Sequence, residues 1–413
     1  MLKITLVASV VSLISMSASA EVSDAQWQQM MTRMSQMETR INALEAENAQ
    51  LRAQGKVPQE DLTPLKQDVA QLQQHNSAAS WSESVRLKGD FRYRYEAIDI
   101  EDVDDRERNR VRGRVNLVAD LPSNTEVGFG IATGGDDPVS TNQTLGDGGS
   151  SKGVRLNLAY FKWAPVDNLY VTAGKFSNPL FRPQKSQLLW DGDWTPEGVG
   201  LVWGGDVLFA SAMGNWIESD TRNGDDVYAW SVQAGVKLPL GGSSFTAALA
   251  YHDVPVDGLG PIFDDSFFGN TSVNDEYVYN YEMIELGAEF VFNLFDRPLS
   301  VFGNYVQNQD ADDLDTGYEF GVNFGKASGT GTWQIGWRYE DLEADAVLGL
   351  LSDSDFAGGG TDAKGHRLSG AYGINKQWTA AFTWFIDNEF GETQLIDGPV
   401  DYDRLQLDLG FKY

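Results

Sequence analysis

From about residue 84 to the C-terminus, apolar and polar residues alternate with a period of two. The chain ends on the segment LQLDLGFKY, in which one face carries only apolar residues, namely Leu405, Leu407, Leu409, Phe411 and Tyr413. Strands of a transmembrane β-barrel alternate in this way because one face meets lipid and the other meets the lumen. The same alternation recurs around Phe91, Val115, Trp230 and Trp337, which predicts a sheet that no helices cover.

The connections between the predicted strands alternate in length. Short ones such as 121–124 and 293–296 are followed by long ones such as 98–105, 134–152 and 253–275. Short turns at one end and long loops at the other are typical of outer-membrane barrels. We therefore expect an all-β fold over residues 81–413, a transmembrane antiparallel β-barrel of about sixteen strands, wide enough for an aqueous channel.

One segment departs from this alternation. The apolar positions are odd-numbered from Tyr277 to Tyr281 but even-numbered from Ile284 to Phe292. A β-bulge near Glu282 would reconcile the two patterns, and so would two strands that the pattern has joined wrongly.

Residues 24–75 have a helical period instead. Apolar residues and one asparagine recur at spacings of three and four, at Trp27, Met30, Met34, Met37, Ile41, Leu44, Asn48 and Leu51. This heptad seam predicts an α-helical coiled coil, with Asn48 at an a position that fixes register. An amphipathic helix packed on its own domain is the alternative. Residues 21–80 are expected to form a periplasmic coiled-coil and linker segment before the barrel.

The first twenty residues read as a secretory signal peptide. Lys3 precedes a largely apolar stretch, and Ala18-Ser19-Ala20 provides a small-residue cleavage site. The remaining chain has no apolar run long enough to predict a transmembrane helix.

Composition narrows the range of partners. The chain has 413 residues, no cysteine and a formal net charge of −29, which argues against nucleic acid as a partner. Acidic residues concentrate in the long loops, where a hydrated exterior is the plain interpretation and calcium binding the alternative. No calcium-loop spacing, metal-ligand cluster or phosphate loop is evident, so no cofactor is expected. The three histidines, His75, His252 and His366, have no sequence neighbours that suggest a Ser-His-Asp set, and no catalysis is expected.

The third long loop contains the candidate constriction. Residues 173–200 carry the acidic side chains and tryptophans Asp191, Asp193, Glu197, Trp190 and Trp194. Three prolines stiffen the segment, so it can fold into the lumen and narrow it. A surface loop with ordinary acidic residues is the alternative.

Arginines lie on the predicted lumen face of the first two strands. If Phe91 and Val115 face lipid, the side chains that face inward are Arg92, Arg94, Arg110, Arg112 and Arg114. Charges on a lipid face cost about 2–4 kcal/mol each at the midplane, so this orientation is well determined. Asp90 and Glu96 are candidate partners, which leaves open whether the arginines are merely paired. Arginines facing loop carboxylates would create a field across the pore.

The segments 173–179 (AGKFSNP) and 190–198 (WDGDWTPEG) resemble the putative porin family of Gram-negative bacteria, and the likeness extends over residues 84–413. The resemblance implies a channel in the cell outer membrane, passive transport of small hydrophilic solutes and ions, contact with lipid and lipopolysaccharide, and a homotrimer. A sugar- or anion-specific porin, and a plugged barrel that serves as an adhesin or envelope anchor, are the alternatives. We expect a nearly balanced pore with a weak preference for cations.

Overall fold

The structure, a computed structural model, describes residues 24–53, 84–219, 226–391 and 398–413. The chain divides into two compact units, Met1–Ala78 and Ala79–Tyr413. The predicted signal peptide lies outside the described residues.

The first unit contains helix α2 (Asp24–Ala53). Met34, Ile41 and Leu44 of the predicted seam are half-buried along this helix, whereas Met37 is exposed. The other seam positions, Trp27, Met30, Asn48 and Leu51, lie on the helix but their side chains are outside the described part, so the coiled coil stays a prediction. No described helix is both long and apolar enough to cross a membrane.

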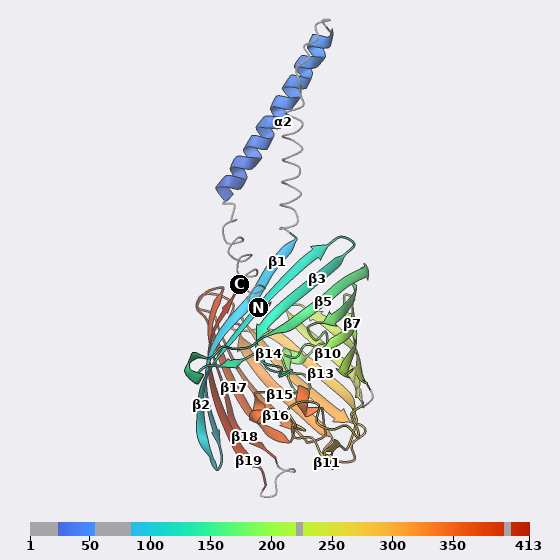
Figure 1. The fold of residues 1–413 in the computed structure, drawn as a ribbon, viewed down its shortest axis with the longest axis vertical. Helices are drawn as coiled ribbons and strands as arrows, with labels where there is room; N and C mark the ends of the chain where they lie inside the picture. The colour runs from blue at the N-terminus through green and yellow to red at the C-terminus, as the bar shows by residue number, and fades with distance from the viewer. Residues whose placement is uncertain (1–23, 54–83, 220–225, 392–397) are drawn as a thin grey trace. The chain divides into compact units, whose positions relative to one another are not determined.

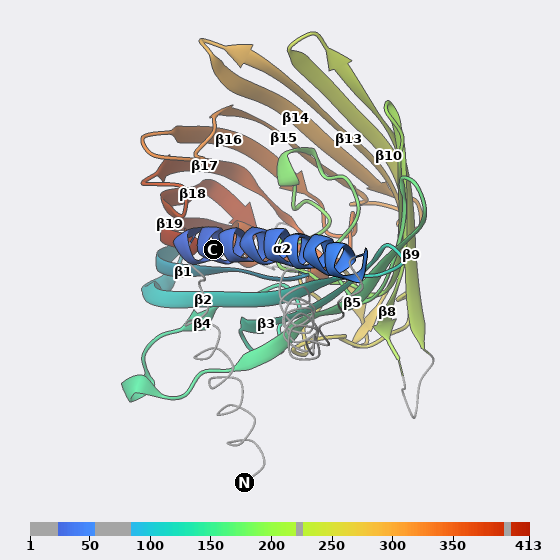
Figure 2. The same cartoon turned by 90° about the horizontal axis from the view of Figure 1, so that it is seen from above.

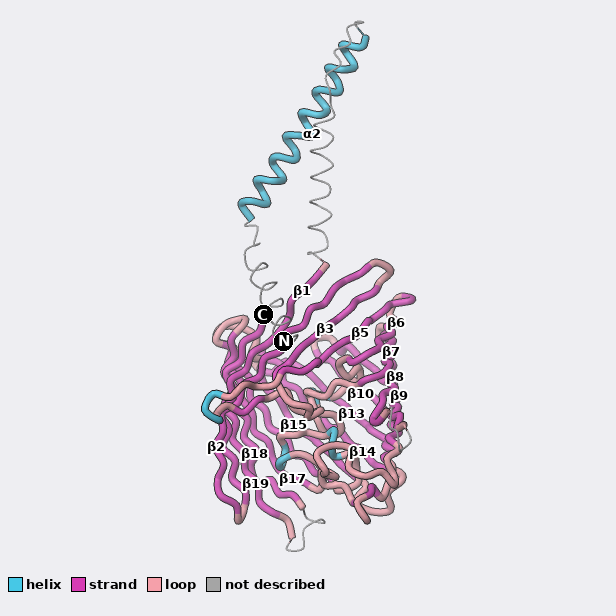
Figure 3. The backbone as a smooth tube through the Cα atoms, viewed as in Figure 1, coloured by secondary structure: helices cyan, strands magenta, loops and turns pink. Residues whose placement is uncertain are grey.

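The second unit is built from β-strands (Figures 1 and 3). The long strands are β1 (Val85–Ile100), β2 (Val103–Leu121), β3 (Thr125–Thr133), β5 (Val154–Val166), β6 (Leu169–Lys175), β7 (Glu197–Gly204), β8 (Leu208–Glu218), β9 (Val227–Leu240), β10 (Ser243–Val254), β13 (Tyr281–Leu294), β14 (Arg297–Asn308), β15 (Thr316–Gly325), β16 (Trp333–Leu342), β17 (Ala363–Gly373), β18 (Trp378–Phe390) and β19 (Val400–Lys412). The two-residue strands are β4 (Gln143–Thr144), β11 (Ser272–Val273) and β12 (Glu276–Tyr277).

The sixteen long strands form one closed antiparallel barrel. Each pairs with its neighbours along the chain, and β1 pairs with β19 from Asp90↔Lys412 to Ile100↔Tyr402 to close the ring. Closure leaves no unpaired sheet edge, which a strand crossing a membrane requires. The predicted all-β barrel of about sixteen strands is therefore confirmed.

The outer surface carries the apolar face of every strand. On β19, Leu407 and Leu409 are exposed on the outer surface, whereas Arg404 and Gln406 are buried on the inner face. Phe91 and Tyr93 on β1 face outward in the same way. The alternation in sequence therefore corresponds to an apolar exterior and a polar interior.

Tight turns connect the strands at one end of the barrel. Strands β9 and β10 are joined by Gly241 and Gly242, whose φ angles of 54° and 101° lie in the region that glycine adopts without strain. Such turns match the twist of adjoining strands and fix their register.

One sequence-based expectation about connections is wrong, and one open alternative is decided. Residues 98–105 do not form a long loop, because β1 and β2 continue until only residues 101–102 connect them. No bulge occurs near Glu282, since β13 pairs without a register shift from Tyr281 onward. Tyr277 lies in the small β11–β12 hairpin and Tyr281 faces the barrel interior, so the apparent change of pattern joined a loop to a strand.

Four loops at the other end contribute to the interior of the barrel. We call residues 134–153 loop 2, 176–196 loop 3, 255–280 loop 5 and 343–362 loop 7. Figure 2 shows loop 3, in green, inside the ring of strands. A buried hydrophobic cluster joins loops 3, 5 and 7, with Leu188, Val256 and Leu348 among its members.

Candidate functional site

Four of the predicted lumen arginines face one another across β1 and β2. The register places Arg92 opposite Arg112, and Arg94 opposite Arg110. Like charges directly opposite each other destabilise a sheet. The interior must therefore supply anionic partners for these side chains.

Asp90 and Glu96, the candidate partners on β1, are such groups. Asp90 accepts hydrogen bonds from Arg112 Nη2 at 3.0 Å and from Arg114 Nε at 2.8 Å. Glu96 is fully buried and accepts from Arg108 Nε and from Arg404 Nη2, the latter at 2.7 Å.

Asp408 on β19 is the third carboxylate of this wall. Arg94 donates to both of its oxygens, from Nε at 2.7 Å and from Nη2 at 2.8 Å. This two-point contact is the geometry that fixes a guanidinium most firmly. Arg94 is 4% exposed as a result.

Loop 3 leaves β6, crosses the lumen and contacts the far wall before it returns. Phe181 N donates to Gln233 Oε1 on β9 at 2.7 Å. Gln184 N donates to Glu289 Oε2 on β13 at 2.9 Å, and Gln184 Oε1 accepts from Asn323 Nδ2 on β15 at 3.1 Å. The loop is thereby held by polar groups of three strands, of which β15 lies nearly opposite its origin in the ring.

Asp193 is the loop 3 acid that meets the predicted arginines. Its Oδ1 lies 3.1 Å from Arg114 Nη1 and 3.5 Å from Arg112 Nη1. Thr141 Oγ1 of loop 2 donates to its other oxygen at 2.9 Å. Burial alone would raise the pKa of Asp193, but Arg112 and Arg114 outweigh burial and leave that pKa below its usual value.

Asp191 has a different environment. It is buried, and its oxygens accept from the backbone N–H groups of Asp193 at 2.6 Å and of Ser354 at 2.9 Å. Its own N–H donates to the Leu351 carbonyl at 2.7 Å, so it fastens loop 3 to loop 7. Burial, and then the nearby carboxylates of Asp353 and Asp193, raise the pKa of Asp191 well above its usual value.

Glu197 is not brought to this wall. It is the first residue of β7, where it shares the outward orientation of the exposed Val199 and Leu201. It pairs with Lys175 Nζ at 2.7 Å. Of the three loop acids singled out in the sequence, Asp193 therefore faces the arginines, Asp191 joins two loops, and Glu197 faces outward.

Trp190 and Trp194 stack on each other, with ring centroids 4.7 Å apart. They are 3% and 8% exposed within the hydrophobic cluster of the loops. Their faces are covered, so these rings stabilise loop 3 and offer no surface on which a solute could stack.

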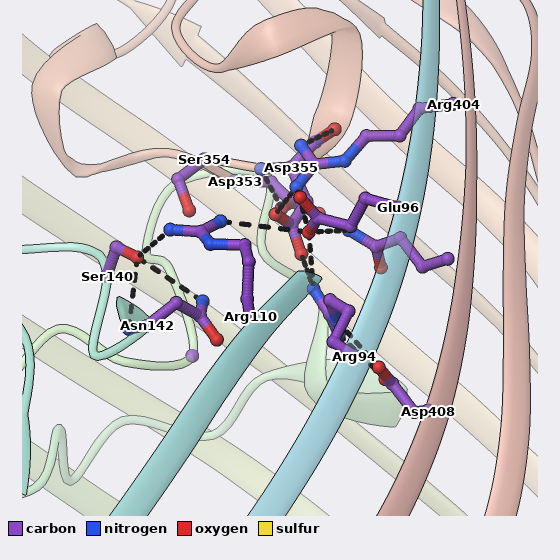
Figure 4. Close-up of polar contacts among 12 residues, drawn as sticks. Arg94, Glu96, Arg110, Ser140, Asn142, Asp353, Ser354, Asp355, Arg404 and Asp408 are labelled. Carbon is purple, nitrogen blue, oxygen red and sulfur yellow. Dashed lines mark hydrogen bonds and ion pairs between the residues drawn. The ribbon is translucent and has the colours of Figure 1, made fainter. Parts of the chain in front are cut away.

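Asp355 of loop 7 contacts the wall but was not among the predicted site residues. Its carboxylate lies 2.7 Å from Arg404 Nη2 and 3.0 Å from Arg94 Nη1 (Figure 4). Burial opposes its ionisation, yet Arg404 and Arg94 hold the pKa of Asp355 well below its usual value. No signal in the sequence separates Asp355 from the other acidic loop residues, because its contact depends on how loop 7 folds.

Within the described ranges, no group of three or more histidine, aspartate or glutamate side chains is placed to hold a metal ion. The carboxylates of the site instead accept hydrogen bonds from guanidinium groups and backbone N–H groups, as described above.

A closed antiparallel sheet, apolar outside and charged inside, with a long loop folded into its lumen, defines a porin-type β-barrel. The chain belongs to the family described as Putative porin, which matches residues 99–258 and 266–413. No curated protein matches its sequence.

Solved structures share this fold. The high-pH structure of Pseudomonas putida OprB matches with a TM-score of 0.56 and 12% identity, over 82% of this chain and 96% of OprB. A mutant porin of Rh. blastica matches with a TM-score of 0.47 and 11% identity, over 80% of this chain and all of that one (100%). At 12% identity, the likeness to OprB shows a common barrel architecture.

Proposed function

We propose that the protein is an outer-membrane channel for passive diffusion of small hydrophilic solutes and ions. The observation that carries this proposal is Asp193, held inside the barrel against Arg112 and Arg114. A loop acid paired with an arginine wall places charges of both signs beside the lumen, and their field acts on charged and dipolar solutes in transit. Export by residues 1–20, and a homotrimer supported by a periplasmic coiled coil, belong to the same proposal.

A plugged barrel is the second candidate. The buried cluster of loops 3, 5 and 7 favours it, because apolar side chains inside the barrel exclude water. Stepwise conductance of the purified protein in planar bilayers tests the choice. A channel gives discrete conductance steps, and a plugged adhesin or anchor gives none.

A sugar-specific channel has less support. Such a channel would present exposed aromatic faces along its lumen, whereas Trp190 and Trp194 cover each other. We expect that adding sugars leaves the stepwise conductance unchanged, and block by a sugar would favour the specific channel instead.

One histidine cluster resembles a hydrolase triad. His252 Nδ1 lies 2.8 Å from Ser231 Oγ, and His252 Nε2 lies 3.1 Å from Glu285 Oε2. These contacts join β9, β10 and β13, which sequence proximity could not show. Ser231 and His252 are 3% and 0% exposed, and the Trp190 ring lies against His252. A serine that no substrate can reach supports a structural role, so we infer a channel and not an enzyme.

A further inference from the structure

The arginine wall carries more positive charge than its carboxylates neutralise. Seven arginines take part in its ion pairs, namely Arg92, Arg94, Arg108, Arg110, Arg112, Arg114 and Arg404. Five carboxylates face them, namely Asp90, Glu96, Asp193, Asp355 and Asp408. Seven positive and five negative charges leave an excess of two.

The excess falls on Arg92 and Arg110. Arg92 reaches Asp408 only at 3.8 Å, and Arg110 reaches Glu96 only at 3.7 Å, the two longest ion-pair distances of the wall. Both carboxylates are already engaged at shorter distance, Asp408 by Arg94 and Glu96 by Arg108 and Arg404. The Nε atoms of Arg92 and Arg110 are buried and have no hydrogen-bond partner among the described residues.

The two guanidinium groups converge on one short segment of loop 2. Arg92 Nη2 donates to Asn142 Oδ1 at 2.6 Å, and Arg110 Nη2 donates to Ser140 Oγ at 3.5 Å. Asn142 Nδ2 donates to Ser140 Oγ at 3.3 Å, so the two neutral partners touch (Figure 4). The Arg92 and Arg110 side chains remain 16% and 12% exposed, which leaves both open to solvent from the lumen.

We propose that Arg92 and Arg110, with the Asn142 amide, form a binding site for a small oxyanion such as a carboxylate or phosphate. Paired oxygens match the planar donor fork of a guanidinium better than a spherical ion does. The bound oxyanion supplies the negative charge that the wall lacks. This site rests on the proposed channel, because the ion reaches the wall through the lumen.

Calorimetric titration of the full-length protein in detergent with inorganic phosphate, at constant chloride, tests the site. Wild type binds phosphate saturably. Arg92→Gln and Arg110→Gln each weaken the affinity by roughly tenfold, the effect of losing one hydrogen bond to a charged group. Arg94, Arg108 and Arg404 keep their own carboxylates in both variants, so the wall persists, and heat-modifiable gel mobility verifies folding.

Arg86→Gln is the matched control. Arg86 lies on the same strand but pairs with Asp120 at 2.8 Å and Glu126 at 3.1 Å, so its loss leaves phosphate affinity unchanged. Arg92→Lys retains the charge but removes the planar fork, and it reduces the preference for phosphate over chloride. A purely structural arginine would not change that preference.

Titrations with acetate and with phosphate show whether the site prefers a carboxylate or a phosphate. Saturable binding of either anion supports the site. No binding by wild type, equal affinity for chloride, or wild-type affinity in Arg92→Gln and Arg110→Gln overturns it. Calorimetry tests the oxyanion site without ion flow, and stepwise conductance in potassium chloride tests the channel without phosphate. The two proposals are therefore tested independently. A conducting protein that binds no oxyanion refutes the site alone, and a non-conducting protein refutes the channel.

Discussion

Two residues of loop 3, Asp191 and Asp193, lie close in the chain but in opposite electrostatic surroundings. Arginines compensate the burial of Asp193 and lower its pKa, whereas burial among carboxylates raises the pKa of Asp191. Asp193 therefore stays ionised at acidic pH. As the pH falls, Asp191 binds a proton at a higher pH than Asp193 does.

This difference predicts how acidity affects the loop contacts. A raised pKa means that the native state binds the proton more tightly than the unfolded chain does. Stability is then greatest below the usual carboxyl pKa and falls as the pH rises toward the raised value. Wild type therefore gains stability on mild acidification relative to Asp191→Asn, which cannot titrate. Thermal unfolding in detergent at pH 5 and pH 7 measures the difference, and an identical pH response in both proteins would contradict it.

At this scale, the sequence allowed part of the site to be predicted. The period-two alternation is sufficient to predict that Arg92 and Arg112 face inward and that Asp90 is a candidate partner. Asp408 and Asp355 could not be assigned, because their contacts with Arg94 depend on barrel closure and on the fold of loop 7. The sequence predicts Glu197 as a loop residue, because nothing in the segment marks the point where β7 begins.

The contrast between the apolar and the polar face of each strand fixes the strand's orientation in the barrel wall. On β17, Leu368 pairs with the outward Trp384 of β18, whereas the next residue, Ser369, pairs with Gly336 and Thr383 on the inner face. Adjacent residues therefore meet different media, lipid on one side and the lumen on the other. The same contrast made the strands predictable from sequence, and the β11–β12 hairpin was missed because a loop has no such contrast.

A matched pair of lysine substitutions tests this contrast. Leu368→Lys places a charge against lipid and costs about 2–4 kcal/mol at the midplane of the bilayer. Ser369→Lys places the same charge beside small residues in the lumen and costs much less. Urea unfolding in lipid vesicles gives both values. Equal costs would mean that the two faces of β17 do not meet different media, and a larger cost for Ser369→Lys would mean that the faces are reversed.

The whole molecule joins a helical unit to a barrel. Strand pairing within one chain closes the barrel, so the barrel does not depend on the N-terminal unit for its fold. The heptad of residues 27–51 instead suggests contacts between chains.

Deleting residues 21–80 therefore weakens the oligomer while the barrel remains folded. Crosslinking in detergent is expected to give trimers for the full chain and fewer for the deletion variant, with unchanged heat-modifiable mobility of the barrel. If the full chain yields only monomers, the heptad has another role.

Asp193, paired with Arg112 and Arg114, is proposed to lie beside the path of ions. The reversal potential in a salt gradient tests it most directly, with Asp193→Asn compared with wild type and with Glu197→Gln. A unit charge about 4 Å from an ion in water contributes about 1 kcal/mol, roughly a fivefold change in relative permeability. Relative to wild type, we predict a shift of Asp193→Asn toward anions and no shift for the outward-facing Glu197→Gln. An unshifted reversal potential in Asp193→Asn, at normal conductance, would contradict the account.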